Sequence, residues 1–89
     1  MKVLKFGADW CPGCLVMKPR FAEIEQENPW LETEFFDADR NPDDLKKWNV
    51  SDVLPCFVFI DKEDNEILRM DGEISKDKLI EVINENKDK

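Results

Sequence analysis

The chain has 89 residues, of which 42% are hydrophobic and 38% charged, and its formal net charge is −8 at pH 7. This length supports a single domain over residues 1–89, and the hydrophobic content is typical of a globular rather than a disordered chain. The acidic balance argues against nucleic acid and anionic membranes as partners, because both require clustered lysine and arginine. Proteins and small molecules remain as partner classes.

The N-terminal residues contain no apolar run typical of a signal peptide, and no stretch reaches the roughly 18 consecutive apolar residues of a membrane-spanning helix. We therefore expect a cytoplasmic protein. In a reducing cytosol, closely spaced cysteines are more often catalytic or metal-binding than structural.

The first 28 residues predict a strand followed by a helix. Residues 2–7 are mostly apolar and favour a short strand. The next apolar residues recur at three-to-four spacing, as in a helix with one face packed on a sheet; they are Val16, Met17, Phe21 and Ile24. Asn28 and Pro29 should end this helix, and Pro19 should kink it.

A second strand is predicted at residues 34–38, and a strand–helix–strand unit of this length implies a parallel pair. Asn41 is the predicted N-cap of a short helix, with Pro42 at its first position. Leu45 and Trp48 should form the inner edge of that helix.

The last third of the chain predicts a hairpin and a final helix. Residues 56–60 form an apolar run typical of a strand buried on both faces, and residues 66–70 should return beside it. Ser75 can cap the last helix, whose packed face should consist of Leu79, Ile80, Val82 and Ile83.

Cys11 and Cys14 are separated by Pro12 and Gly13 at the predicted strand-to-helix junction. Unpaired N–H groups and the positive dipole end stabilise a thiolate there, so we expect Cys11 to be the exposed, more acidic thiol. Pro12 suits the first helical position, and Gly13 keeps the approach open. Cys14 can then attack a mixed disulfide on Cys11 and release the reduced partner. The spacing predicts an attacking and a resolving thiol.

Two other interpretations of the cysteines stay open. A zinc or iron–sulfur site could use Cys11, Cys14 and Cys56, since thiolates hold both kinds of centre. Zinc normally takes four ligands, however, and the chain has three cysteines and no histidine. Because of this shortage of ligands, we expect no metal. The other interpretation, a pair of inert core cysteines, would not require the intervening Pro-Gly pair.

The order of these segments resembles the thioredoxin family over almost the whole chain. The matching pieces are Ala8-Asp9-Trp10-Cys11 with Cys14, Pro19, Asp39-Arg40-Asn41-Pro42, Pro55 after an aliphatic residue, and Gly72 before the last helix. The resemblance implies an α/β fold of the minimal thioredoxin-like type, with a central four-stranded mixed sheet and helices on both faces. The chain starts at what would be the family's second strand, which is why four strands are expected.

The resemblance also implies roles for particular residues. Cys11 would be the nucleophile and Cys14 the resolving thiol. A cis Leu54-Pro55 peptide beside them would offer backbone hydrogen bonds to an extended substrate. The implied substrate-binding residues are Trp10, Pro12, Gly13, Leu54 and Pro55.

The chain departs from the family pattern around these cysteines. Pro12-Gly13 reverses the familiar Gly-Pro order. Lys5 stands where family members usually carry a buried acid, and Phe35 stands where a basic residue often accompanies that acid. Cys56 replaces a common threonine after the proline, so it is either a third thiol near the pair or a small buried strand residue.

Lys5 leaves two possibilities. If its side chain runs toward the cysteines, its charge favours the thiolates of Cys11 and Cys14 and makes the couple less reducing than a typical thioredoxin. Otherwise it points to the far face and pairs with a surface acid such as Glu34 or Asp37.

We therefore expect a monomeric protein-disulfide reductase that serves cell redox homeostasis and electron transport. Its partners would be disulfide-containing client proteins and an electron donor, either a reductase or a small thiol. It would need no cofactor beyond its redox-active disulfide, Cys11–Cys14. The resemblance also leaves open a glutaredoxin-like reductase and a redox-inactive interaction module. Trp30 and Trp48 are expected as core or boundary residues, and Trp10 either shapes the substrate surface or is an amphipathic packing residue.

Overall fold

The strands of the chain form one mixed sheet. The computed structural model describes residues 1–50 and 53–89, and within them four strands are arranged in the order β2-β1-β3-β4. β1 pairs in parallel with β2 and antiparallel with β3, which pairs antiparallel with β4. The predicted mixed sheet is thus confirmed. The strands are β1 (Lys2–Gly7), β2 (Glu32–Asp37), β3 (Cys56–Ile60) and β4 (Glu66–Asp71).

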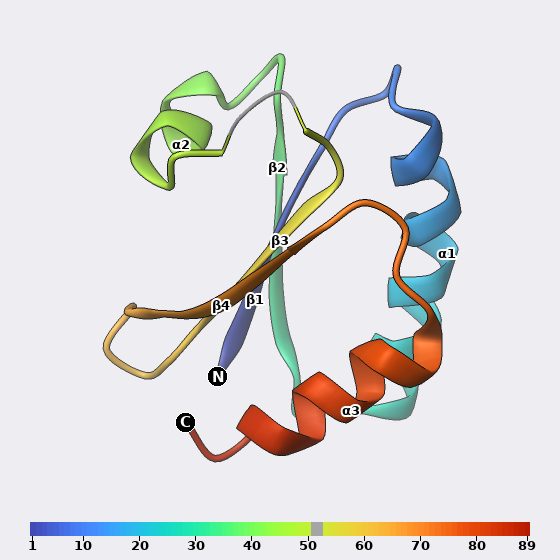
Figure 1. Cartoon of the computed structure of the whole chain (residues 1–89), viewed down its shortest axis with the longest axis vertical. Helices are drawn as coiled ribbons and strands as arrows, with labels where there is room; N and C mark the ends of the chain where they lie inside the picture. The colour runs from blue at the N-terminus through green and yellow to red at the C-terminus, as the bar shows by residue number, and fades with distance from the viewer. Residues whose placement is uncertain (51–52) are drawn as a thin grey trace.

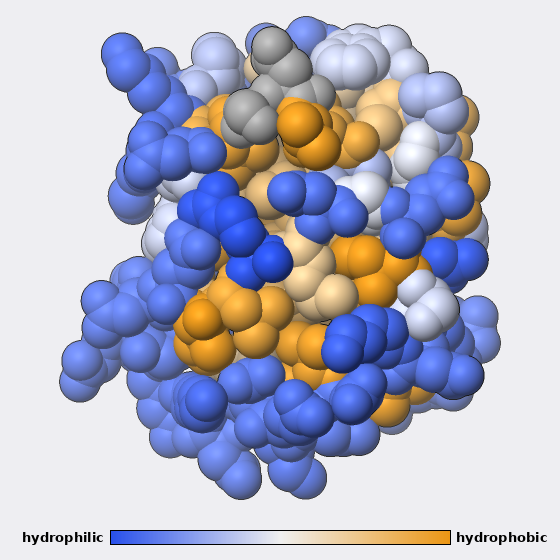
Figure 2. All heavy atoms as spheres, in the orientation of Figure 1, coloured by the Kyte–Doolittle hydropathy of each residue, from blue (hydrophilic) through white to orange (hydrophobic). Residues whose placement is uncertain are grey.

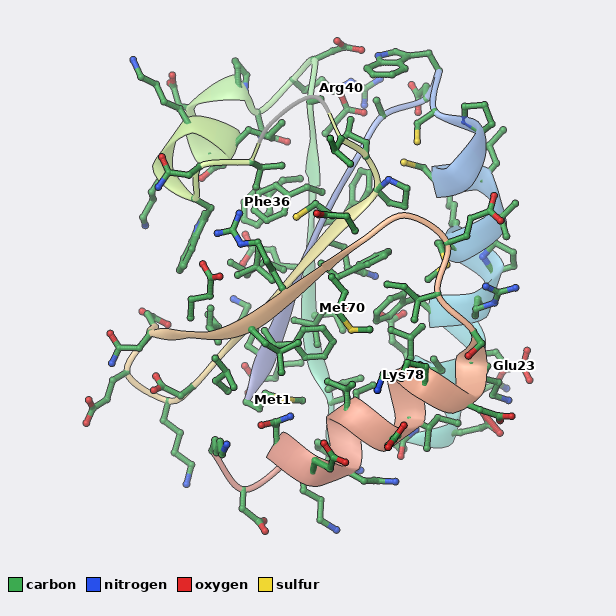
Figure 3. All side chains as sticks on the ribbon, viewed as in Figure 1. Met1, Glu23, Phe36, Arg40, Met70 and Lys78 are labelled. Carbon is green, nitrogen blue, oxygen red and sulfur yellow. The ribbon has the colours of Figure 1, made fainter. Side chains whose placement is uncertain are left out.

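Helices cover both faces of this sheet, as predicted. α1 (Pro12–Glu27) and α3 (Lys76–Asn86) lie on one side, and the short α2 (Pro42–Lys47) lies on the other (Figure 1). In Figure 3, Phe36 points toward α2 and Met70 toward α3, in keeping with two separate apolar clusters. Within the described residues, no helix is long and apolar enough to cross a membrane.

The alternation of side chains along β1 divides the core into these two clusters. Val3 packs with α1 and α3, whereas Leu4 and Phe6 pack with α2. All five residues of β3 are buried, which explains why this strand appears in the sequence as a continuous apolar run. Figure 2 shows hydrophilic residues over much of one face of the molecule, with hydrophobic residues reaching the surface between them.

The predicted helix ends are largely confirmed. Cys11 is the N-cap of α1, which continues through Pro19 to Glu27, and the kink expected at Pro19 stays a prediction. The Ser75 hydroxyl accepts a hydrogen bond from the N–H of Lys78 at 3.2 Å, as a cap should.

Asn41 is the N-cap residue of α2 and Pro42 follows at its first position, as predicted, but the Asn41 Oδ1 accepts a hydrogen bond from the N–H of Asp37 at 3.0 Å rather than from the helix. One local prediction was wrong. Trp30 is 47% exposed, since it lies in the turn between α1 and β2 rather than on a packed face. Trp48 packs partly buried against the cluster under α2, as expected.

A polar contact ties α1 to the sheet beneath it. The Lys5 ammonium on β1 donates a hydrogen bond to Glu25 Oε1 on α1 at 2.7 Å, and the Thr33 hydroxyl on β2 donates to the same oxygen. Burial opposes ionisation of Glu25, but the hydrogen bonds from Lys5 and Thr33 outweigh it and lower the pKa of that carboxyl. The pairing of Lys5 with Glu34 or Asp37 was therefore wrong; Glu34 pairs with Lys2 at 2.7 Å.

We predict that Glu25→Gln lowers the free energy of unfolding by about 1 kcal/mol near pH 7 and by much less near pH 3. A carboxyl whose pKa is lower in the folded protein stabilises it above its unfolded pKa, and this contribution is lost as pH falls through the folded pKa. Urea denaturation of both proteins at the two pH values measures the difference. Glu34→Gln, at the exposed pair on the same strands, is the control and should change little. An equal loss at both pH values for Glu25→Gln would contradict the prediction.

Candidate active site

The start of α1 holds the first cysteine by its sulfur. The backbone N–H of Cys14 donates a hydrogen bond to Cys11 Sγ at 3.3 Å, and the N–H of Cys11 itself bonds to the Ala8 carbonyl at 3.2 Å. This is the position at which an unpaired helical N–H and the positive dipole end favour a thiolate. The predicted helix-start location of Cys11 is confirmed.

The exposure predicted for Cys11 was wrong. Only 3% of this residue is exposed, whereas Cys14 is half-buried. The physical reason is the cap itself, because the Cys11 side chain turns back over the first helical turn to accept the N–H of Cys14. The same contact that favours the thiolate thus removes it from open solvent.

Cys14 keeps its proton more firmly than a free thiol. Burial is the main cause, and a hydrogen bond to Cys11 adds to it, so that the pKa of Cys14 is raised to about 11. Both cysteines are free thiols in this structure. At neutral pH the two sulfurs therefore differ: one accepts a helical N–H, and the other is a protonated donor.

Two glycines allow the helix start to sit this close to the sheet. A Cβ atom on Gly7 would lie 3.0 Å from Cys14 Sγ and 3.3 Å from a ring carbon of Phe35. A Cβ on Gly13 would lie 3.0 Å from Cδ of Pro55. The sequence interpretation assigned no role to Gly7; a glycine as the last residue of an apolar strand was the signal that could have found it.

Most of the predicted substrate-binding residues lie around the start of α1, but the Leu54 side chain packs against the cluster on the α2 side of the sheet. The Leu54-Pro55 peptide is cis, and Pro55 is buried beside Gly13. Pro12 is exposed at the first position of α1. Trp10 is 61% exposed, and its indole N–H donates to Asp39 Oδ2 at 3.1 Å, which fixes the ring beside the site.

Cys56 is not brought into this site. Its side chain is buried in the cluster with Leu4 and Phe6 on the α2 side of the sheet, so its description as a small buried strand residue is confirmed. Burial and a hydrogen bond to Asp71 raise the pKa of the Cys56 thiol to about 12. In the part of the chain that the structure describes, no group of three or more histidine, cysteine or acidic side chains is arranged to hold a metal ion. The arrangement of the three cysteines thus gives no support to the metal-site alternative.

Lys5 lies on the same side of the sheet as Cys14, and both residues line one cavity between α1 and the strands. Because Glu25 pairs with the ammonium, the charge that reaches the thiols is weaker than that of an isolated lysine. The less reducing potential expected from Lys5 stays a prediction.

Known proteins resemble this chain in sequence. A protein-family model described as thioredoxin matches residues 1–81. Thioredoxin C-3 of Corynebacterium nephridii is 31% identical over 70 residues, which are 79% of this chain and 47% of that protein. Mouse glutaredoxin-3 is 33% identical over 79% of this chain, which corresponds to 20% of that protein. The chain thus spans half or less of the length of these two relatives.

The solved structures agree with the sequence comparison. The X-ray structure of Fasciola hepatica thioredoxin superimposes with a TM-score of 0.85 and 33% identity, covering 94% of this chain and 78% of the other. The family model covers nearly all of the chain, including both cysteines and the Leu54-Pro55 peptide. The chain belongs to the thioredoxin family.

Proposed function

We propose that this chain is a thiol–disulfide oxidoreductase that reduces protein disulfides, with Cys11 attacking and Cys14 resolving. The observation that carries the proposal is the hydrogen bond from the N–H of Cys14 to Cys11 Sγ at the start of α1. This hydrogen bond favours the nucleophilic thiolate at Cys11, whereas the neighbouring Cys14 stays protonated.

The exchange then runs in two steps. The Cys11 thiolate bonds to one sulfur of a client disulfide, and the other client sulfur leaves as a thiolate and takes up a proton. Cys14 loses its proton and attacks Cys11 Sγ, which releases the second client thiol and leaves a Cys11–Cys14 disulfide. The client disulfide gains two electrons, and the dithiol of the protein loses two.

The surroundings of Cys11 favour a client that docks before it reacts. Because Cys11 is buried, a client sulfur reaches it only when the client lies against the surface around the start of α1, where the neighbouring Trp10 side chain is exposed. An extended client segment could hydrogen-bond to the backbone around Leu54 and Pro55. Apolar docking of this kind selects proteins with a disulfide near an exposed segment.

A complete cycle requires an electron donor, either a reductase or a small thiol, because each turnover leaves the protein as a disulfide. We propose that the protein acts as a monomer in the cytoplasm and that the Cys11–Cys14 disulfide is its only redox group.

We predict that Cys11→Ser and Cys14→Ser each abolish catalysed reduction of insulin disulfides, whereas Cys56→Thr retains it. Two thiols complete the exchange, and Cys56 packs on the other face of the sheet. Insulin turbidity with a dithiol donor measures the activity, and Cys14→Ser should also trap a mixed disulfide on Cys11. Loss of activity in Cys56→Thr, with the fold intact by circular dichroism, would argue against this assignment.

A second prediction concerns the order of alkylation. In the reduced protein at about pH 7, iodoacetamide should modify Cys11 faster than Cys14, because only thiolates react and the pKa of Cys14 is raised to about 11. Cys14 should catch up as the pH rises toward that value. Peptide mapping after short reaction times gives both rates. Faster labelling of Cys14 at neutral pH would reverse the two roles.

A further inference from the structure

The loop between β4 and α3, residues 72–75, is held against the proline of the site and against α1 (Figure 1). The N–H of Gly72 donates a hydrogen bond to the Pro55 carbonyl at 2.8 Å. Further along the loop, the Ile74 carbonyl accepts a hydrogen bond from the Arg20 guanidinium on α1 at 2.6 Å. Glu73 lies between these two anchored residues, so the loop holds its backbone in place beside the start of α1.

The side chain of Glu73 lies over the first turn of α1. Its Cγ is 3.8 Å from the position that a Cβ atom on Gly13 would occupy, and the same position is 3.0 Å from Cδ of Pro55. Gly13 stands between the two cysteines, and Pro55 belongs to the peptide to which we propose that an extended client binds. The exposed Glu73 carboxylate is thus at the edge of the surface that a client must contact to reach Cys11.

The carboxylate of Glu73 is not neutralised within the described part of the chain, where it forms no ion pair and no side-chain hydrogen bond. The Arg20 guanidinium is bonded to a backbone carbonyl of the same loop. Lys76, in the first turn of α3, pairs instead with two acids of α1, Glu23 and Glu27. The charge of Glu73 therefore remains available to a molecule that docks at this surface.

The other charges near the site largely balance one another. Asp9 and Lys18 line the same cavity behind the start of α1, and Asp39 is followed in the sequence by Arg40. Glu73 is left as the unbalanced charge at the docking surface. The chain as a whole carries a net charge of −8, so its long-range field also attracts cationic rather than anionic segments.

We propose that Glu73 selects clients that carry a lysine or arginine next to the disulfide that Cys11 attacks. The inference rests on the proposed function, because it names the class of protein disulfide that the same exchange would reduce. A basic side chain beside the attacked cysteine brings its charge to the Glu73 carboxylate when the client sulfur reaches Cys11. An acidic side chain at that place meets a like charge, so Glu73 favours one class of client and disfavours the other.

Single-turnover reduction of two short peptides by the reduced full chain tests this proposal. Each peptide is closed by one disulfide, and either lysine or glutamine stands on both sides of each of its cysteines. The measured quantity is the ratio of the two second-order rate constants, lysine peptide over glutamine peptide, from acid-quenched samples. Because the glutamine peptide is the reference, a change in the reactivity of Cys11 itself cancels from this ratio.

Glu73→Gln should lower the ratio by about 2–5-fold, the range expected for loss of one exposed ion pair. Glu73→Lys should lower the ratio further, because it replaces attraction by repulsion. Glu85→Gln is the matched control and should leave the ratio unchanged. Glu85 is an exposed acid in the last turn of α3, at the end of that helix away from the loop, and it forms no ion pair in the described residues.

Two results would overturn the inference and leave the proposed function standing. The first is a ratio that Glu73→Gln leaves unchanged. The second is an equal decrease in Glu85→Gln, which would assign the preference to net charge rather than to the position of Glu73. A reduced chain that opens neither peptide and does not reduce insulin disulfides would overturn both the inference and the proposed function.

Discussion

The hydrogen bond from the N–H of Cys14 to Cys11 Sγ is the contact on which the chemistry of this protein depends. It requires α1 to begin beside the end of β1, and the fold secures that position. Met17, Phe21 and Ile24 bury one face of the helix, and the Glu25 carboxylate connects it to two strands. Since the helix is held along its length, its first turn has a fixed place over the sheet.

The same geometry makes the two sulfurs unequal. Cys11 is buried and accepts a helical N–H, whereas Cys14 is protonated and lies against a cavity. Dithiol exchange uses this difference, because the sulfur that accepts the helical N–H attacks the client and the neighbouring thiol then resolves the mixed disulfide. The helix start donates an N–H to one sulfur, and burial raises the pKa of the other.

Local patterns predicted most of the fold because they reflect local physics. Apolar spacing located α1, a continuous apolar run located β3, and Ser75 marked the start of α3. The errors arose where packing between distant segments decides the outcome. Glu25 lies 20 residues after Lys5 in the sequence, and the two side chains meet only because α1 packs over β1. The burial of Cys11 depends on the rotamer of a capping side chain, which the spacing of the motif does not determine.

Equilibration of the protein with mixtures of reduced and oxidised glutathione tests the central claim most directly, because it asks whether Cys11 and Cys14 act as one couple. Intact-mass and peptide analysis of acid-quenched samples identifies the species present. We predict a single two-electron transition to a Cys11–Cys14 disulfide, with Cys56 free throughout. Stable glutathione adducts on Cys11 without that disulfide, or a disulfide that includes Cys56, would contradict the account.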